Sequence, residues 1–221
     1  MKVNGTPVLG RLQDPYLELH DSHGSPPIVN DNWRDLQEAE IQQSGLAPTD
    51  DNESAVVKRL PPGNYTAIIR GADGSQGIGL VELYDLSSTD PSELGNLSVR
   101  ADVGTDDNVL IDGLILRGGN TKRVMFRALG PSVKSGGTAV PGTLSNPEMD
   151  LFDANGTLLR NNDNWTDAPN VGEIVATGLA PLDNNEAAIL LPLGPGNYTA
   201  VVRGVNRTTG IALAEAYKLN N

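Results

Sequence analysis

Apolar and polar residues alternate along much of the chain, and this alternation predicts short β-strands. In residues 64–70, for example, Tyr65, Ala67 and Ile69 fall on one side of an extended backbone and the intervening residues fall on the other. Such a strand covers a core with one face. The same pattern predicts strands over residues 16–20, 55–60 and 78–84, which are separated by turns rich in Gly and Pro.

The chain contains an internal repeat, because residues 15–86 recur as residues 147–219 with one inserted residue near Gly172. The two segments share the motifs NDNW, GLAP and PGNYTA, and almost half of the aligned positions are identical. Each copy is predicted to carry one short helix, over residues 36–43 and residues 170–176, inserted on a β scaffold. The chain therefore holds two copies of one module.

Residues 96–129 occur only once, between the two copies. Their apolar runs predict three strands, which span residues 96–103, 108–117 and 122–129. We expect an all-β fold of two tandem jelly-roll-like or Ig-like β-sandwich modules, of which the first lacks its opening strands. The expected divisions are an N-terminal arm (1–14), a first, incomplete module (15–86), a linker (87–95) and a second, complete module (96–219, with opening strands 96–129, a loop 130–146 and the repeat core 147–219).

The missing strands leave an apolar groove in the first module. They would bury about six to eight apolar side chains, each worth about 1.5–3 kcal/mol, which is comparable with the whole stability of a domain, about 5–15 kcal/mol. Either both modules share residues 96–129, or a strand from another molecule fills the groove by donor-strand complementation, or the chain is a fragment cut from a longer protein. The candidate donors are the C-terminal strand and the arm, whose branched apolar residues within the first ten positions are Val3, Val8 and Leu9.

A family resemblance rests on a DxxG turn after an LxLxD-like strand (LELHDSHG and MDLFDANG), on the Asn- and Asp-rich loop, and on LPPGNYTAIIRG. Together with two preceding apolar strands, these motifs resemble the bacterial pre-peptidase C-terminal domain, a jelly-roll-like β-sandwich appended to secreted enzymes. The NDNW, GLAPxD and ESAxV signatures are also similar to repeats of large exported bacterial proteins. The resemblance implies a bacterial, extracellular or cell-surface location.

Composition and charge exclude several classes of protein. Aromatic residues make up 4% of the chain, Gly and Pro number 25 and 15, and cysteine is absent, which disfavours coiled coils and excludes disulfides. The formal net charge of −12 disfavours binding to nucleic acid or anionic lipid. No apolar run is long enough to be inserted in a membrane, and residues 1–10 lack the apolar core of a signal peptide. The two histidines, His20 and His23, are Phe152 and Asn155 in the second copy, so we expect no enzyme.

Calcium is the cofactor that the acidic loops would suit, because it takes roughly six to eight oxygen ligands. The alternative is that Asn and Asp serve the turns themselves through hydrogen bonds with the backbone, and that Asp35 and Asp167 are helix N-caps. The candidate ligands are Asp21, Asn30, Asp31 and Asp35 in the first copy, and Asp153, Asn162, Asp163 and Asp167 in the second.

Trp33 and Trp165 occupy equivalent positions, where an exposed indole would stack on a polysaccharide and a buried one would pin the loop to the sandwich. We therefore expect a non-enzymatic structural protein whose partner is a further copy of itself, assembled head to tail into a fibre or surface layer. The alternative is a calcium- or carbohydrate-binding adhesion module of a larger secreted protein.

Overall fold

The computed structural model describes residues 2–3, 6–86 and 94–219. The protein is all-β, with 42% strand and 9% helix in several antiparallel sheets, which confirms the fold class expected from the alternation. It divides into two compact units, Met1–Glu93 (unit 1) and Leu94–Asn221 (unit 2). Within the described ranges, no helix has the length and apolar character needed to cross a membrane.

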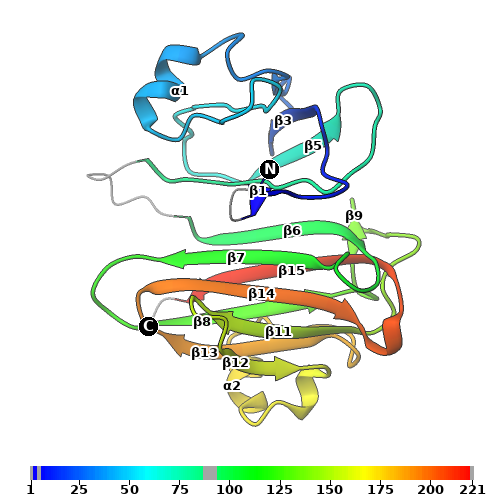
Figure 1. The fold of residues 1–221 in the computed structure, drawn as a ribbon. Coiled ribbons are helices and arrows are strands. Elements are labelled where there is room, and N and C mark those ends of the chain that lie inside the picture. The colour runs from blue at the N-terminus through cyan, green and yellow to red at the C-terminus, as the bar shows by residue number, and fades with distance from the viewer. Residues whose placement is uncertain (1, 4–5, 87–93, 220–221) are drawn as a thin grey trace. The chain divides into compact units, whose positions relative to one another are not determined.

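Unit 2 is a β-sandwich of two four-stranded antiparallel sheets (Figure 1). One sheet has the strand order β12-β11-β14-β7 and the other has the order β13-β8-β15-β6. The eight strands are β6 (Asn96–Val103), β7 (Leu110–Leu116), β8 (Lys122–Leu129), β11 (Pro147–Asp153), β12 (Leu158–Asn162), β13 (Ala187–Leu193), β14 (Gly196–Gly204) and β15 (Gly210–Leu219). The short elements of this unit are β9 (Lys134–Ser135), β10 (Thr138–Ala139), η1 (Trp165–Asp167), α2 (Val171–Ala176) and η2 (Val205–Arg207).

The opening strands β6, β7 and β8 are integral to the core of unit 2. Strand β8 lies between β13 and β15, antiparallel to both. Its residues Val124, Phe126 and Ala128 are fully buried in the main core between the sheets. Met125 points to a second cluster that includes Ile174 of α2. One strand therefore contributes to both hydrophobic clusters.

Unit 1 has one three-stranded sheet of order β4-β3-β5. Its elements are β1 (Lys2–Val3), β2 (Thr6–Pro7), β3 (Pro15–Asp21), β4 (Ile28–Asn30), α1 (Glu38–Ser44) and β5 (Tyr65–Gly71). The strands predicted at residues 55–60 and 78–84 are wrong, because within the described residues these segments form no strand beyond one isolated bridge at Ile78. Their counterparts in unit 2 are β13, which pairs with β8, and β15, which pairs with both β8 and β6. These partner strands come from residues 96–129, a segment that occurs once in the chain, so unit 1 has no equivalent of them.

Helix α1 begins later than its sequence predicts. Its N-cap is Gln37 and not Asp35, whereas Gly45 ends the helix in the left-handed region with φ 75°, as expected. The Gln37 side chain donates a hydrogen bond to Val57 O (2.8 Å) and accepts one from Val57 N (3.2 Å). These two bonds tie the start of the helix to the backbone of residue 57. In unit 2 the N-cap position of α2 is occupied by Asn170 and not by Asp167, and Asn170 Nδ2 donates to Leu190 O at the equivalent place.

Candidate functional site

The candidate site of unit 1 consists of residues 54–60 and 78–86, which we call the acceptor groove because the sequence predicts that a donor strand lies between them. In this part of the repeat, a residue in unit 1 matches the residue numbered 133 higher in unit 2. Residues 54–60 therefore correspond to β13, and residues 78–86 correspond to most of β15. In unit 2 β8 lies between these two strands and pairs with both of them. The groove is the place in unit 1 where such a strand would lie.

Most of the large apolar side chains of the acceptor groove are exposed, and Val56 and Val57 are partly buried. Leu80 is 61% exposed and Leu83 is 56% exposed, whereas Ala216, the counterpart of Leu83, is 2% exposed. Among the described residues of unit 1, the buried apolar side chains are those of Trp33 and Ile41. Unit 1 thus carries the apolar residues of a sandwich without the core that would bury them. The other exposed apolar residues of the groove are Leu60, Ile78, Val81, Tyr84 and Leu86.

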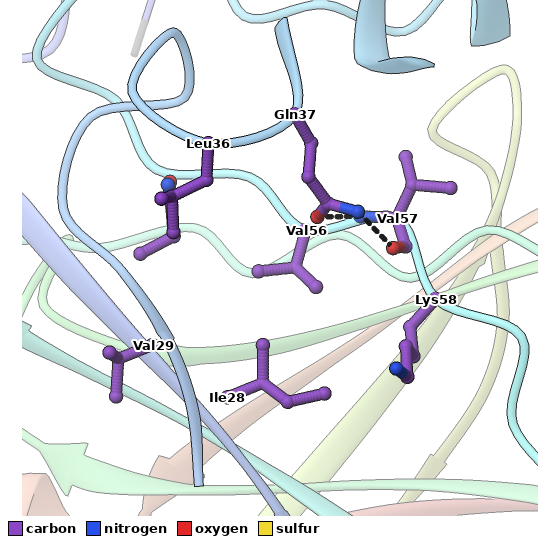
Figure 2. Close-up of a pocket in the computed structure, with 8 residues that line it drawn as sticks. Ile28, Val29, Leu36, Gln37, Val56, Val57 and Lys58 are labelled. Atoms are coloured by element: carbon purple, nitrogen blue, oxygen red, sulfur yellow. Dashed lines mark hydrogen bonds between the residues drawn. The ribbon is translucent and has the colours of Figure 1, made fainter.

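A hollow of about 170 Å³ lies beside residues 56–58, between β4 and the start of α1. Figure 2 shows Val56 directed toward Ile28 and shows Gln37 bound to the backbone of Val57. The residues that match Val56 and Val57 in unit 2, Ile189 and Leu190, lie opposite Phe126 and Met125 of β8. The hollow therefore adjoins positions that bulky donor side chains cover in the complete sandwich.

The N-terminal arm belongs to unit 1. Leu12 N donates to Ile78 O and Ile78 N donates to Gly10 O, both at 2.9 Å. In unit 2, Leu144 N and Ile211 N make the same two bonds with Ile211 O and Gly142 O. The arm thus repeats the end of the loop that precedes β11, and its backbone pairs within its own unit.

The proposed donor residues of the arm are placed as follows. Lys2 pairs with Pro7, and Val3 pairs with Thr6, through their backbones. The side chain of Val3 lies outside the described part of the chain. Leu9 is highly exposed and Val8 is partly buried. The other candidate donor, β15, lies between β8 and β6, so both of its edges are already paired.

The Asn- and Asp-rich loops use their side chains to hold the backbone. Asn162 Oδ1 accepts from Ala188 N (2.8 Å), and Asn30 Oδ1 accepts from Ala55 N (2.9 Å) at the equivalent place. Asp153 Oδ1 accepts from the backbone N of Asn155 and Thr157, and these bonds hold the pKa of that carboxyl below its ordinary value. Asn30, Asn162 and Asp153 are therefore explained by turn and loop geometry.

The structure does not bring the candidate calcium ligands together as a cluster of acids. Within residues 2–3, 6–86 and 94–219, no group of three or more His, Asp or Glu side chains is placed to hold a metal ion. Hydrogen bonds from Ser25 and His23 hold the pKa of Asp21 below its ordinary value. Burial, followed by the charge of Asp167, raises the pKa of Asp163. The pKa of each of these carboxyls is thus shifted by groups in its own loop. Asp31 and Asp35 lie in the loop of unit 1 that is equivalent to the loop of Asp163.

The two tryptophans pin these loops. Trp33 is 2% exposed, and its backbone N donates to Glu53 O (2.9 Å), while the guanidinium of Arg34 lies 4.1 Å from its ring centroid. Trp165 is partly buried, and its indole N donates to Asp183 O (3.1 Å). An indole buried to this degree cannot stack on a sugar without leaving its site, so the geometry of Trp33 favours the structural role.

The sequence reasoning missed a buried polar contact of the sandwich that involves Arg127. In unit 2 Arg127 of β8 donates from Nε to Glu215 Oε2 (2.9 Å) and from Nη2 to Tyr217 OH (3.1 Å). Glu215 and Tyr217 form an E-x-Y pair that recurs as Glu82 and Tyr84 in unit 1. The recurrence of this pair on a predicted strand was the available signal.

Of the two histidines, His20 contacts a carboxylate on its own strand. His20 Nε2 lies 2.8 Å from Glu18 Oε2, two residues away on the same strand. Neither a protein-family model nor a curated protein matches the chain.

Proposed function

We propose that this chain is a non-enzymatic structural protein, and that unit 1 accepts opening strands from another repeat by β-strand complementation. The observation that carries the proposal is the contrast between equivalent positions of the two units. Leu83 is exposed where Ala216 is buried, and within the described part of the chain residues 79–86 form no strand ladder, whereas their counterparts in β15 pair with β8. Exposed apolar side chains on a segment whose counterpart is a paired strand are a feature that strand addition satisfies.

Such complementation would join repeats head to tail. The donor segment and the acceptor groove are different surfaces, so the contact is heterologous and continues from repeat to repeat unless its rotation closes a ring. A continuing series of this kind builds a fibre or a surface layer. An extracellular or cell-surface location suits such an assembly.

The number of donors argues for a partner beyond residues 1–221. These residues contain one opening segment, 96–129, and two repeat cores. The described structure places that segment in unit 2, where β8 residues Val124, Met125 and Phe126 are fully buried. Copies that exchange this segment among themselves would still leave one core open for every chain. The donor for unit 1 is therefore the opening segment of a further repeat.

The test is to supply unit 1 with opening strands covalently. A second copy of residues 94–138 replaces residues 1–6 and is joined directly to Pro7, and the rest of the chain is unchanged. Pro7 is the junction because residues 7–15 align with residues 139–147. We expect the amides of residues 54–60 and 79–86 to become protected from hydrogen exchange, and the binding of an apolar dye to fall. The matched control carries the same extension with Asp at the positions of Val124 and Phe126. Equal exchange in the extended and parent chains would refute the proposal.

A further inference from the structure

We infer that the acceptor groove recognises one particular donor strand, of the β8 type, through an arginine that binds Glu82 and Tyr84. The inference rests on the proposed function and specifies its partner. That partner is an opening segment of a repeat outside residues 1–221, and its β8-type strand inserts antiparallel between residues 54–60 and residues 79–86.

The register of the inserted strand follows from unit 2. There Arg127 lies directly opposite Glu215 on β15 and opposite Ala188 on β13. The counterparts of these two residues in unit 1 are Glu82 and Ala55. A β8-type strand in the groove would therefore place its arginine between Ala55 and Glu82. The flanking donor residues would cover Val56 and Val57, at the edge of the hollow in Figure 2.

Unit 1 retains the polar receptor for that arginine. Tyr84 OH donates to Glu82 Oε1 (3.0 Å), as Tyr217 OH donates to Glu215 Oε1 (2.8 Å). In unit 2 this pair receives the guanidinium of Arg127, which lies 5.0 Å from the centroid of the Tyr217 ring. A carboxylate beside an aromatic face suits a planar guanidinium, which binds the acid and stacks on the ring. The same two side chains are thus assembled in unit 1 at the same place in the repeat.

The charges at the other end of the groove distinguish this donor from β8 itself. Lys58 and Arg59 in unit 1 replace Leu191 and Pro192 of β13. In unit 2 Arg123 lies opposite Pro192. An identical donor would place Arg123 opposite Arg59, and like charges that face each other across strands are unfavourable. The best partner for unit 1 therefore keeps the arginine at position 127 and carries an acidic residue at position 123.

The experiment adds a synthetic strand to the full chain. The probe is a peptide with the sequence of residues 120–130, NTKRVMFRALG, and the chain carries Trp165→Phe, so that Trp33 alone reports. Trp165 packs against the cluster that contains Met125 of β8, so an inserted strand changes the surroundings of its counterpart Trp33. We expect a saturable change in Trp33 fluorescence, and tighter binding by about threefold when the peptide carries Glu at position 123.

Charge reversal tests the arginine. Glu82→Arg in the chain should weaken binding of the peptide by about tenfold or more, whereas Asp73→Arg, at an exposed turn, should leave it within about twofold. The peptide with Glu at position 127 should bind the unsubstituted chain weakly and bind the Glu82→Arg chain with restored affinity. This exchange also separates recognition from damage to unit 1, because a misfolded variant cannot regain affinity.

Two results would overturn the inference: no saturable change with any peptide, or equal affinity for the Glu82→Arg and Asp73→Arg chains. The covalent extension that tests the proposed function is a separate measurement. If the extension protects the groove and the peptides fail, the recognition by arginine is wrong and strand acceptance stands. If the extension gives no protection, the proposed function fails whatever the peptides do.

Discussion

The buried carboxyl of Asp112 predicts that unit 2 loses stability as the pH rises from about 4 to about 7. Asp112 lies on β7 in the row of buried residues that contains Leu110 and Leu116, and it is 3% exposed. Neither of its side-chain oxygens has a hydrogen-bond partner within the described residues. Burial, followed by the negative charge of Glu215, raises the pKa of Asp112 from 3.8 to about 7.

The direction of the effect follows from proton linkage. Between pH 3.8 and about 7, the folded protein holds a proton on Asp112 that the unfolded chain has released. The free energy of unfolding therefore falls as the pH rises through this window and becomes level above it. A difference of about three pH units, at about 1.4 kcal/mol each, gives a loss of about 4 kcal/mol.

Asp112→Asn removes the titrating group with little change of shape. We expect the stability of this variant relative to the parent to rise by about 4 kcal/mol between pH 4 and pH 8. The assay is urea unfolding, at pH 4 to 8, in a Trp33→Phe background where Trp165 fluorescence reports unit 2. Asp107→Asn, at an exposed aspartate of the same unit, is the control. If the Asp112→Asn variant and its parent differ by the same free energy at every pH, the assigned burial of a charge on Asp112 is incorrect.

Three further predictions concern contacts that hold unit 2 and its loops. Arg127→Ala should cost about 3–5 kcal/mol in urea unfolding, because it leaves the buried Glu215 carboxylate without its cation; Arg123→Ala, which breaks an exposed pair, should cost less than about 1 kcal/mol. Asn162→Ala should cost about 1–3 kcal/mol by the same measurement, because it leaves the buried backbone N–H of Ala188 unsatisfied; an unchanged midpoint would contradict the loop network. Adding calcium or a chelator should leave the thermal midpoint unchanged, and a shift of several degrees would restore the calcium hypothesis.

The strands that the sequence predicts correctly are those whose partners are available. Strand β8 was predicted over residues 122–129 and is observed at Lys122–Leu129, because its dense apolar pattern coincides with two neighbours that pair with it. Residues 78–84 are also rich in apolar residues and were predicted as a strand, yet they form no ladder in unit 1. Alternation records which side of a strand faces a core, but a strand also needs hydrogen-bond partners that lie far away in the sequence.

The candidate site was only partly predictable for the same reason. The mismatch between one opening segment and two cores is visible in the sequence, and it located the groove in unit 1. The role of Arg127 was not visible, because residues 96–129 occur once and an internal comparison cannot show that this arginine belongs with Glu215. Asp35 was misassigned as the N-cap, since the two hydrogen bonds between the Gln37 side chain and the backbone of Val57 depend on tertiary packing.

The connectivity of the complete sandwich is compatible with the proposed donor in trans for unit 1. Tyr217 near the end of β15 pairs with Asn96 at the start of β6, and Lys218 N donates to Gly95 O. The opening segment therefore has one end beside the end of the repeat core and its other end joined to that core by the loop 130–146. A segment that enters from either side reaches the same groove, so the sandwich requires these strands in place and does not require a particular covalent link. Complementation by another repeat would thus give unit 1 the strand pairings that unit 2 has. The difference is that the middle strand would come from another chain segment.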